Sequence, residues 1–130
     1  MPCRRTHEEE GRVVGGLIGV IGNLAVQNHR IEIAPWTPFD LGEVVACGLV
    51  GMLVGQAGAV LPDQIEPGTS SWHRKTAHSW TALGAVTLGT LSSVTADLPG
   101  WARLVVGAFG AGYATHLLSD SETPRGLPLI

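Results

Sequence analysis

The sequence is poor in aromatic residues, in cysteine and in net charge, and each shortage excludes a class of protein. Aromatic side chains make up 5% of the 130 residues, so small residues, including 18 glycines, must provide much of the packing. A formal net charge of -3 does not fit a nucleic-acid-binding protein, which is usually basic. It does not fit an acidic disordered tail either, because such a tail is far more negative. Cys3 and Cys47 form no Cys-x-x-Cys zinc motif and no disulfide framework, so we expect two free thiols. No nucleic-acid partner is therefore indicated.

Hydrophobic residues are plentiful and predict one all-α domain over residues 1–130. They form 45% of the sequence and give a mean hydropathy of +0.24. Their stretches are separated by proline-containing or polar segments, which is typical of a helical bundle. The expected helices run from Thr6 to about Val26, from Asp40 to Pro62, from about Lys75 to Ala96 and from about Trp101 to Ser119. Residues 27–40 hold two prolines and are predicted to form a loop with a short extended piece at Ile31–Ile33.

Local signals mark the ends of the first two helices. Thr6 with Glu9, and Asp40 with Glu43, have the spacing of a capping box, in which each side chain bonds the other residue's backbone N–H. Pro62 is predicted to end the second helix, because proline has no backbone N–H to donate.

Glycine recurs at every fourth position of the first predicted helix, at Gly11, Gly15 and Gly19. Such a stripe allows another backbone to come close, either within the chain or in a homo-oligomer. A secretory signal peptide is the alternative interpretation of this segment. Three glutamates at positions 8–10 argue against it, because a signal peptide begins with positive charge.

Short connections predict an up-down-up-down bundle, in which four segments share one end. These segments are the start of the first helix, the end of the second, the start of the third and the end of the fourth. They contain imidazole and carboxylate groups, which bind zinc, manganese or iron. The predicted ligands are His7, Asp63, His73, His78, His116 and Asp120. We therefore predict one or two divalent ions, zinc first, at one end of the bundle, with His29 at the other end.

Each of these residues also has an ordinary structural interpretation. His7 alone would be a helix cap or a surface residue, and His73 lies beside two basic residues as in a solvated loop. His116 and Asp120, four residues apart on one helix face, could form a plain ion pair. Their shared placement at one end favours a metal site over these separate interpretations.

A site of this composition suits hydrolysis of phosphoesters, which paired metal ions catalyse in many enzymes. Asp63 or Glu66 could act as the general base, and Arg74 and Arg125 could bind the anionic substrate. The alternative is a non-catalytic membrane or assembly protein in which the metal only staples helix ends together. An open coordination position favours the enzyme, and a closed set of ligands favours the staple.

The same motifs resemble a known family, the membrane-bound metal-dependent hydrolases. The resemblance rests on LPDQIEP at 61–67, HRKTAHS at 73–79, GYATHLLSDSETPRGLPLI at 112–130, and Thr6-His7 with the glycine that follows. It covers residues 6–130. The family includes inner-membrane-associated hydrolases linked to the SOS repressor, and is distantly similar to zinc-dependent phospholipase C and related single-strand nucleases.

The resemblance implies a helical fold, a hydrolase activity and the six metal ligands already named. The chain departs from the family pattern at two places. Many relatives have an acidic residue soon after LPD, whereas Gln64, Ile65 and Glu66 follow Asp63 here. Many also have a glycine in the segment where Lys75 and Thr76 stand. These departures point to a different substrate pocket or partner.

The distribution of apolar, aromatic and basic residues predicts a membrane protein, with a soluble cytoplasmic bundle as the alternative. The second helix has the roughly 20 apolar residues that a bilayer requires. Tryptophans fall at both ends of the bundle, like two interfacial belts: Trp72 and Trp80 at the site end, Trp36 and Trp101 at the other. Most arginines and lysines lie at the site end, so the positive-inside rule places the site on the cytoplasmic face of the inner membrane, next to lipid.

Overall fold

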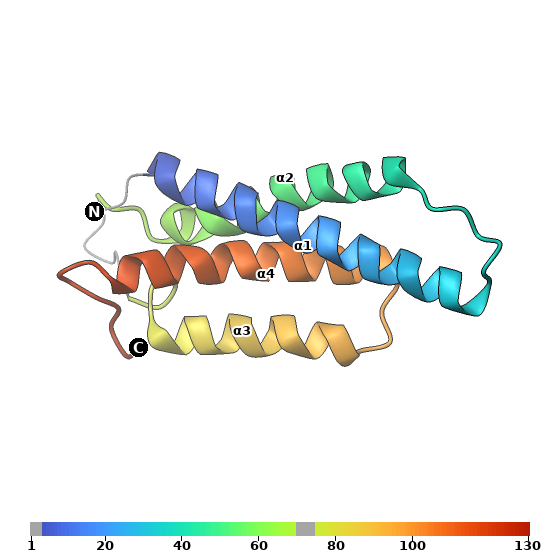
Figure 1. Ribbon diagram of the computed structural model, residues 1–130. Helices are drawn as coiled ribbons and strands as arrows, with labels where there is room; N and C mark the ends of the chain where they lie inside the picture. The colour runs from blue at the N-terminus through green and yellow to red at the C-terminus, as the bar shows by residue number, and fades with distance from the viewer. Residues whose placement is uncertain (1–3, 70–74) are drawn as a thin grey trace.

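A computed structural model describes residues 4–69 and 75–130, and in these ranges the chain is all-helical. The helices are α1 (Arg4–Ile33), α2 (Leu41–Ile65), α3 (Trp80–Thr95) and α4 (Gly100–Ser121). They alternate in direction along one long axis, as predicted (Figure 1). The beginnings of α1 and α3 and the ends of α2 and α4 therefore share one end, called the site end below. The opposite end is called the far end.

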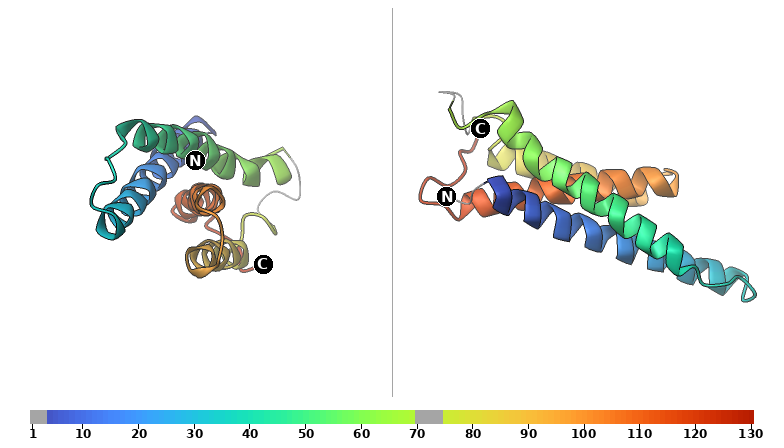
Figure 2. Two further views of the ribbon diagram at one scale, coloured as in Figure 1. Left: turned by 90° about the vertical axis from the view of Figure 1, so that its right-hand side faces the viewer. Right: turned by 90° about the horizontal axis from the view of Figure 1, so that it is seen from above.

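The four helices do not form a symmetric bundle. α1, α2 and α4 all pack against one another, whereas α3, within the described ranges, packs on α4 alone. Figure 2 shows α4 between α3 and the α1–α2 pair, with that pair reaching further than α3 at the far end. α3 is therefore positioned relative to α1 and α2 through α4.

Glycine allows α1 and α2 to approach closely. A Cβ atom added at Gly15 would collide with the backbone of Gly51 and Gly55, and one added at Gly55 would collide with Gly11. The predicted close approach of another backbone is confirmed, and that backbone belongs to the same chain. A homo-oligomer stays a prediction and would need a different face.

The loop predicted at residues 27–40 was wrong for its first half, because α1 continues to Ile33 and includes the predicted extended piece. The side chain of Gln27 explains the extension. Its amide donates to the carbonyl oxygen of Asp40 and its oxygen accepts from the Asp40 N–H, both at 2.7 Å. Polar residues that face a neighbouring helix resemble loop residues in the sequence, and this caused the error.

The start of α2 agrees with the prediction, whereas its end does not. Asp40 caps the helix as expected, accepting a hydrogen bond from the Glu43 N–H at 3.0 Å, but its own N–H donates to Gln27 rather than to Glu43, so only half of the capping box forms. Pro62 does not end it: the proline is buried inside the helix, which continues to Ile65. Proline removes only one hydrogen bond, and the final turn is held by the Glu66 N–H, which donates to the Pro62 carbonyl at 2.9 Å.

The other helix ends shift by a few residues from their predicted positions. α3 begins at Trp80 rather than Lys75, because Ser79 is the cap and accepts from the Ala82 N–H at 3.0 Å. α1 already includes Arg4, so Thr6 is not its cap. α4 lies within two residues of the prediction at each end.

The exterior between the two ends is unusually apolar. Large hydrophobic side chains on all four helices are exposed, among them Leu17, Leu53, Leu88 and Val105. The buried hydrophobic residues are few, and Tyr113, Leu117 and Leu127 form the cluster near the site end. Within the described ranges α2 is long and apolar enough to cross a membrane; the core helix of a soluble protein would pass the same test.

Candidate metal centre

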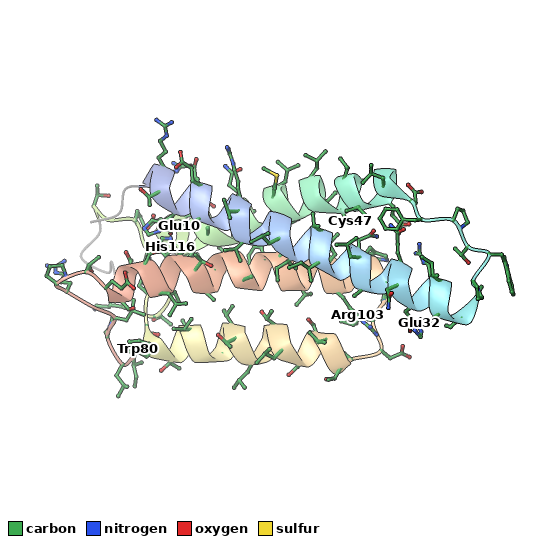
Figure 3. The ribbon with its side chains drawn as sticks, in the orientation of Figure 1. Glu10, Glu32, Cys47, Trp80, Arg103 and His116 are labelled. Atoms are coloured by element: carbon green, nitrogen blue, oxygen red, sulfur yellow. The ribbon has the colours of Figure 1, made fainter. Side chains whose placement is uncertain are left out.

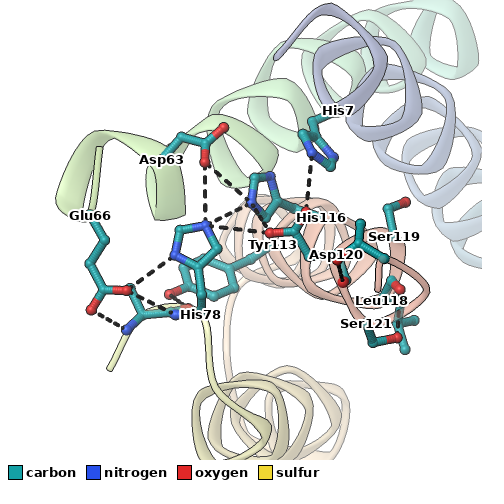
Figure 4. A network of polar contacts seen from close by, with 12 residues as sticks. His7, Asp63, Glu66, His78, Tyr113, His116, Leu118, Ser119, Asp120 and Ser121 are labelled. Atoms are coloured by element: carbon teal, nitrogen blue, oxygen red, sulfur yellow. Dashed lines mark hydrogen bonds and ion pairs between the residues drawn. The ribbon is translucent and has the colours of Figure 1, made fainter. Parts of the chain in front are cut away.

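Five of the six predicted ligands meet at the site end, delivered by four parts of the fold. α1 supplies His7, α2 supplies Asp63, and the segment before α3 supplies His78 (Figure 4). α4 supplies His116 and Asp120 on one face. His73 and Arg74 lie outside the described residues. We call the five assembled residues the ligand cluster.

Several pairs of atoms in the ligand cluster are spaced like the ligands of one ion. His78 Nε2 lies 3.0 Å from His116 Nε2, 3.3 Å from Asp63 Oδ1 and 3.8 Å from Asp120 Oδ2. His116 Nε2 lies 3.7 Å from each of the same two carboxylate oxygens. Ligands about 2.0–2.1 Å from a tetrahedral zinc ion would be roughly 3.4 Å apart. His78, His116 and Asp120, whose ligand atoms all lie within 4.8 Å of one another, could therefore bind one ion, with Asp63 beside them.

His7 joins the cluster from the side opposite His78. Its Nε2 lies 3.7 Å from Asp120 Oδ1, the oxygen that faces away from His78 and His116. Its ring packs on that of His116, with the centroids 4.0 Å apart. His7, Asp63 and His116 also offer ligand atoms within 4.8 Å of one another. Asp120 thus presents one oxygen to each of two adjacent positions.

The ligand cluster is not satisfied by its own hydrogen bonds. The Nδ1 atoms of His7 and His116 are buried and have no hydrogen-bond partner among the described residues. Glu10 Oε2 is the nearest carboxylate oxygen to His7 Nδ1, at 3.7 Å, which is beyond hydrogen-bond range. Buried polar atoms without partners are rare in folded proteins. With two carboxylates also present, the charge of a divalent cation would balance the cluster.

Burial differs between the ligands. His7, His78, His116 and Asp120 are almost completely buried. The side chain of Asp63 is 30% exposed, which makes it the most accessible member of the cluster. Solvent therefore reaches the cluster on the Asp63 side.

Opposing effects set the charge of His78. Burial alone would lower its pKa, but hydrogen bonds to Asp63 and Glu66, with the negative charge of Asp120, raise it above the ordinary value of 6.5. Without a metal, a protonated His78 can bridge these carboxylates. The residues can thus form either an ion-pair network or a metal site, and a metal ion would have to displace that proton.

Glu66, a predicted general base, lies beside the cluster rather than within it. Its carboxylate accepts hydrogen bonds from the backbone N–H groups of Lys75, Ala77 and His78, at 3.0, 2.8 and 3.3 Å. Burial would raise its pKa, but these donors and the His78 ring hold that pKa below the ordinary value of 4.5. Its catalytic role stays a prediction.

Three other residues matter for the site, and one of them was predicted. Arg125 is exposed in the tail after α4, and its substrate-binding role stays a prediction. Tyr113, one turn before His116, donates its hydroxyl to the Ala77 carbonyl at 3.0 Å and was missed. Glu10, one turn after His7, accepts from Ser119 at 2.7 Å and was also missed. Their spacing from the two histidines was the available signal.

No family model, no curated protein and no solved structure matches this chain. The resemblance to the membrane-bound metal-dependent hydrolases therefore stays a prediction based on sequence motifs.

Proposed function

We propose that this chain is a metal-dependent hydrolase, zinc being the first choice of metal and manganese or iron the alternatives, that acts on phosphoester-type substrates at a membrane face. The observation that carries the proposal is the ligand cluster itself. Its three imidazoles and two carboxylates are the donor set of a catalytic rather than a thiolate structural site. The resemblance drawn from the sequence motifs points to the same reaction class.

Each member of the cluster has a role in this proposal. His78, His116 and Asp120 would hold one ion, and His7, Asp63 and His116 form the second group of ligand atoms that could hold an ion. A bound divalent ion polarises a phosphoryl oxygen and makes water a better nucleophile near neutral pH. Asp63, partly exposed and next to His78, is the residue placed to accept a proton from that water. Arg74 and Arg125 are proposed to hold the phosphate.

The proposal places the chain in the inner membrane, with a soluble cytoplasmic form as the alternative. The 22 residues of α4 span about 33 Å, close to the roughly 30 Å of a bilayer's hydrocarbon core. Trp80 and His116 lie towards the site end, whereas Arg103 and Glu32 lie towards the far end (Figure 3). Trp101, 72% exposed, begins α4 at the far end, so exposed tryptophans mark both ends of an apolar exterior.

Charge gives the proposed orientation. Arg4, Arg5, Lys75 and Arg125 belong to the site end, and Arg30 and Arg103 to the far end. By the positive-inside rule the site end faces the cytoplasm. Lipid headgroups would then surround the entrance beside Asp63, so a phospholipid is a suitable substrate.

A structural staple is the second candidate, and one observation favours it. The ligand cluster is nearly closed to solvent, and it joins α1, α2 and α4 to the start of α3. A metal held in this way could simply secure the helix ends.

Asp63→Asn separates the two functions, because it keeps the volume of the side chain and removes its charge. The wild type is first assayed with zinc or manganese against phosphomonoesters, phosphodiesters and phospholipids. In the hydrolase, Asp63→Asn abolishes turnover while metal content falls less, since the histidines remain. The matched control is Asp97→Asn, an exposed aspartate at the far end, which should be fully active. A wild type that is inert on every substrate, with an Asp63→Asn variant that merely unfolds earlier, would favour the staple.

A further inference from the structure

One arginine lies within the apolar exterior and not at an end of the molecule. Arg12 is exposed on α1, about 12 Å along the helix from Arg4, where α1 begins. Exposed apolar side chains adjoin this position, such as Val13, which is 62% exposed. The other basic residues in the described part of the chain lie towards the two ends: Arg4, Arg5, Arg30, Lys75, Arg103 and Arg125. An arginine placed inside a membrane is a candidate binding residue.

A glutamine on the neighbouring helix holds the Arg12 side chain. Nε of Arg12 donates to Oε1 of Gln56 at 2.8 Å, in an exposed contact between α1 and α2. Gln56 is the one amide side chain in the apolar stretch of α2 from Val44 to Pro62. The bond uses Nε and leaves the two terminal nitrogens of the guanidinium without a hydrogen bond within residues 4–69 and 75–130. These nitrogens can therefore bind a further acceptor.

No carboxylate among the described residues neutralises the charge of Arg12. The three glutamates that precede it on α1 have other partners at 2.7 to 3.0 Å, which are Arg4 for Glu8, Arg5 for Glu9 and Ser119 for Glu10. Phosphate is the anionic group that a bilayer offers, and a guanidinium binds phosphate through paired N–H donors. The long arginine side chain can also reach the headgroup level from apolar surroundings.

Arg12 and Gln56 lie on the side of α2 where solvent reaches the ligand cluster. Asp63 follows Gln56 by seven residues, close to two full helical turns, so both side chains lie on one face of α2, about 10 Å apart along its axis. The Asp63 side chain is the most accessible member of the cluster. A headgroup bound at Arg12 would therefore lie next to the proposed entrance.

We propose that Arg12 and Gln56 form a binding site for the phosphate of an anionic phospholipid, on the outward face between α1 and α2. The phosphate accepts hydrogen bonds from the terminal nitrogens of Arg12, while Gln56 holds the guanidinium in place. The inference rests on the proposed membrane placement, and it adds a headgroup site to Arg74 and Arg125. It needs neither a bound metal nor turnover, so it can be tested apart from the hydrolase.

The test is lipid binding by metal-free, delipidated protein in detergent micelles, measured by native mass spectrometry. The two probes are dioleoyl phosphatidylglycerol and dioleoylglycerol, which have the same chains and differ in the phosphate headgroup. Wild type should bind the phospholipid more tightly than the diacylglycerol. Arg12→Gln should lose about fivefold in affinity for the phospholipid, as expected for one basic residue near a lipid phosphate, and should bind the diacylglycerol as wild type does.

Arg5→Gln is the matched control, because it removes the same charge from the same helix. Arg5 lies two turns before Arg12 on the same face, but its guanidinium is already paired with Glu9 at 3.0 Å. This variant should change the affinity for phosphatidylglycerol by less than about twofold, since exposed ion pairs contribute little. A loss as large as that of Arg12→Gln would mean that only net charge matters, and would overturn the site.

The outcomes separate this inference from the proposed function. If wild type needs detergent to stay in solution and Arg12→Gln binds phosphatidylglycerol as tightly as wild type, the lipid site is wrong and the membrane placement stands. A wild type that is soluble without detergent and binds neither lipid would overturn both. If wild type hydrolyses no phosphoester and yet loses phosphatidylglycerol binding in Arg12→Gln, the hydrolase fails and the lipid site stands.

Discussion

Polar side chains from several segments meet at both ends of the molecule, but the two sets differ in how donors and acceptors are matched. At the far end donors meet acceptors: the Gln27 amide donates to Asn23 Oδ1 at 2.7 Å, Asn23 donates to Glu43 at 3.0 Å, and Arg30 pairs with Glu43 at 2.7 Å. At the site end two imidazole nitrogens lie 3.0 Å apart and face carboxylates at 3.3–3.8 Å.

This difference distinguishes a structural network from a binding site. The far-end network supplies its own donors, so it is complete as it stands. The ligand cluster brings the Nε2 atoms of His78 and His116 together with two carboxylates, so it gathers groups that accept a proton or bind a cation. Such an arrangement is costly unless a proton or a cation is shared within it. The following predictions test whether the two ends differ in this way.

The largest effect is expected at the close contact between α1 and α2, because both ends of the bundle depend on it. Gly15→Val would drive a branched side chain into the α2 backbone, and should cost about 3 kcal/mol or more of unfolding free energy and abolish zinc binding. Gly22→Val is the matched control on the same helix, because nothing lies within 4 Å of its added Cβ. Denaturation in detergent and zinc titration measure both. Equal stability of the two variants would contradict the close packing.

An intermediate effect is expected at the far end. Gln27→Ala removes both bonds to the Asp40 backbone and the bond to Asn23, and should cost about 1–2 kcal/mol of stability, since Asp40 can still bond to water. Zinc affinity should be unchanged. His29→Ala, the control at an exposed position of the same helix, should stay within about 0.5 kcal/mol of wild type. Loss of zinc by either variant would mean that the two ends are not independent.

A smaller effect is expected on the pH dependence of stability. Glu66 has a lowered pKa, so its stabilisation is present above 4.5 and lost as pH falls through the folded-state pKa. His78 has a raised pKa, so its stabilisation is present below 6.5 and lost as pH rises through the folded-state pKa. For these two groups, metal-free protein is most stable between about pH 4.5 and 6.5.

Zinc should reverse the loss of stability at the high-pH end of this range, because the ion binds His78 only after the proton has left. Melting temperatures are therefore measured across this pH range with a chelator and with excess zinc. We expect stability to rise above pH 6.5 with zinc and to fall with the chelator. Two parallel profiles would show that the cluster is only an ion-pair network.

The sequence was sufficient to predict the architecture, since apolar stretches and short connections imply four alternating helices. It was also sufficient to predict which end collects His7, Asp63, His78, His116 and Asp120. Both predictions depend on the direction of each helix, which survives errors of several residues at helix ends. The misplaced ends at Ile33 and Pro62 changed neither result.

What could not be predicted depended on contacts between distant segments. Gln27 resembles a loop residue until Asp40 is known to lie beside it. Glu66 resembled a base because its carboxylate follows Asp63 closely, whereas its partners are backbone N–H groups that the sequence does not display. The reduced contact of α3, which packs on α4 alone, likewise has no signal in the hydrophobic pattern.

The central claim is that the ligand cluster binds a divalent metal, and the most direct test is the metal content of the purified chain. Wild type, His116→Ala and His29→Ala are each equilibrated with zinc and analysed by elemental mass spectrometry. We predict about one to two ions per chain for wild type and for His29→Ala, and loss of most of that metal for His116→Ala, whose Nε2 lies among the other ligands. A folded wild type that takes up neither zinc nor manganese at micromolar concentrations would contradict the claim.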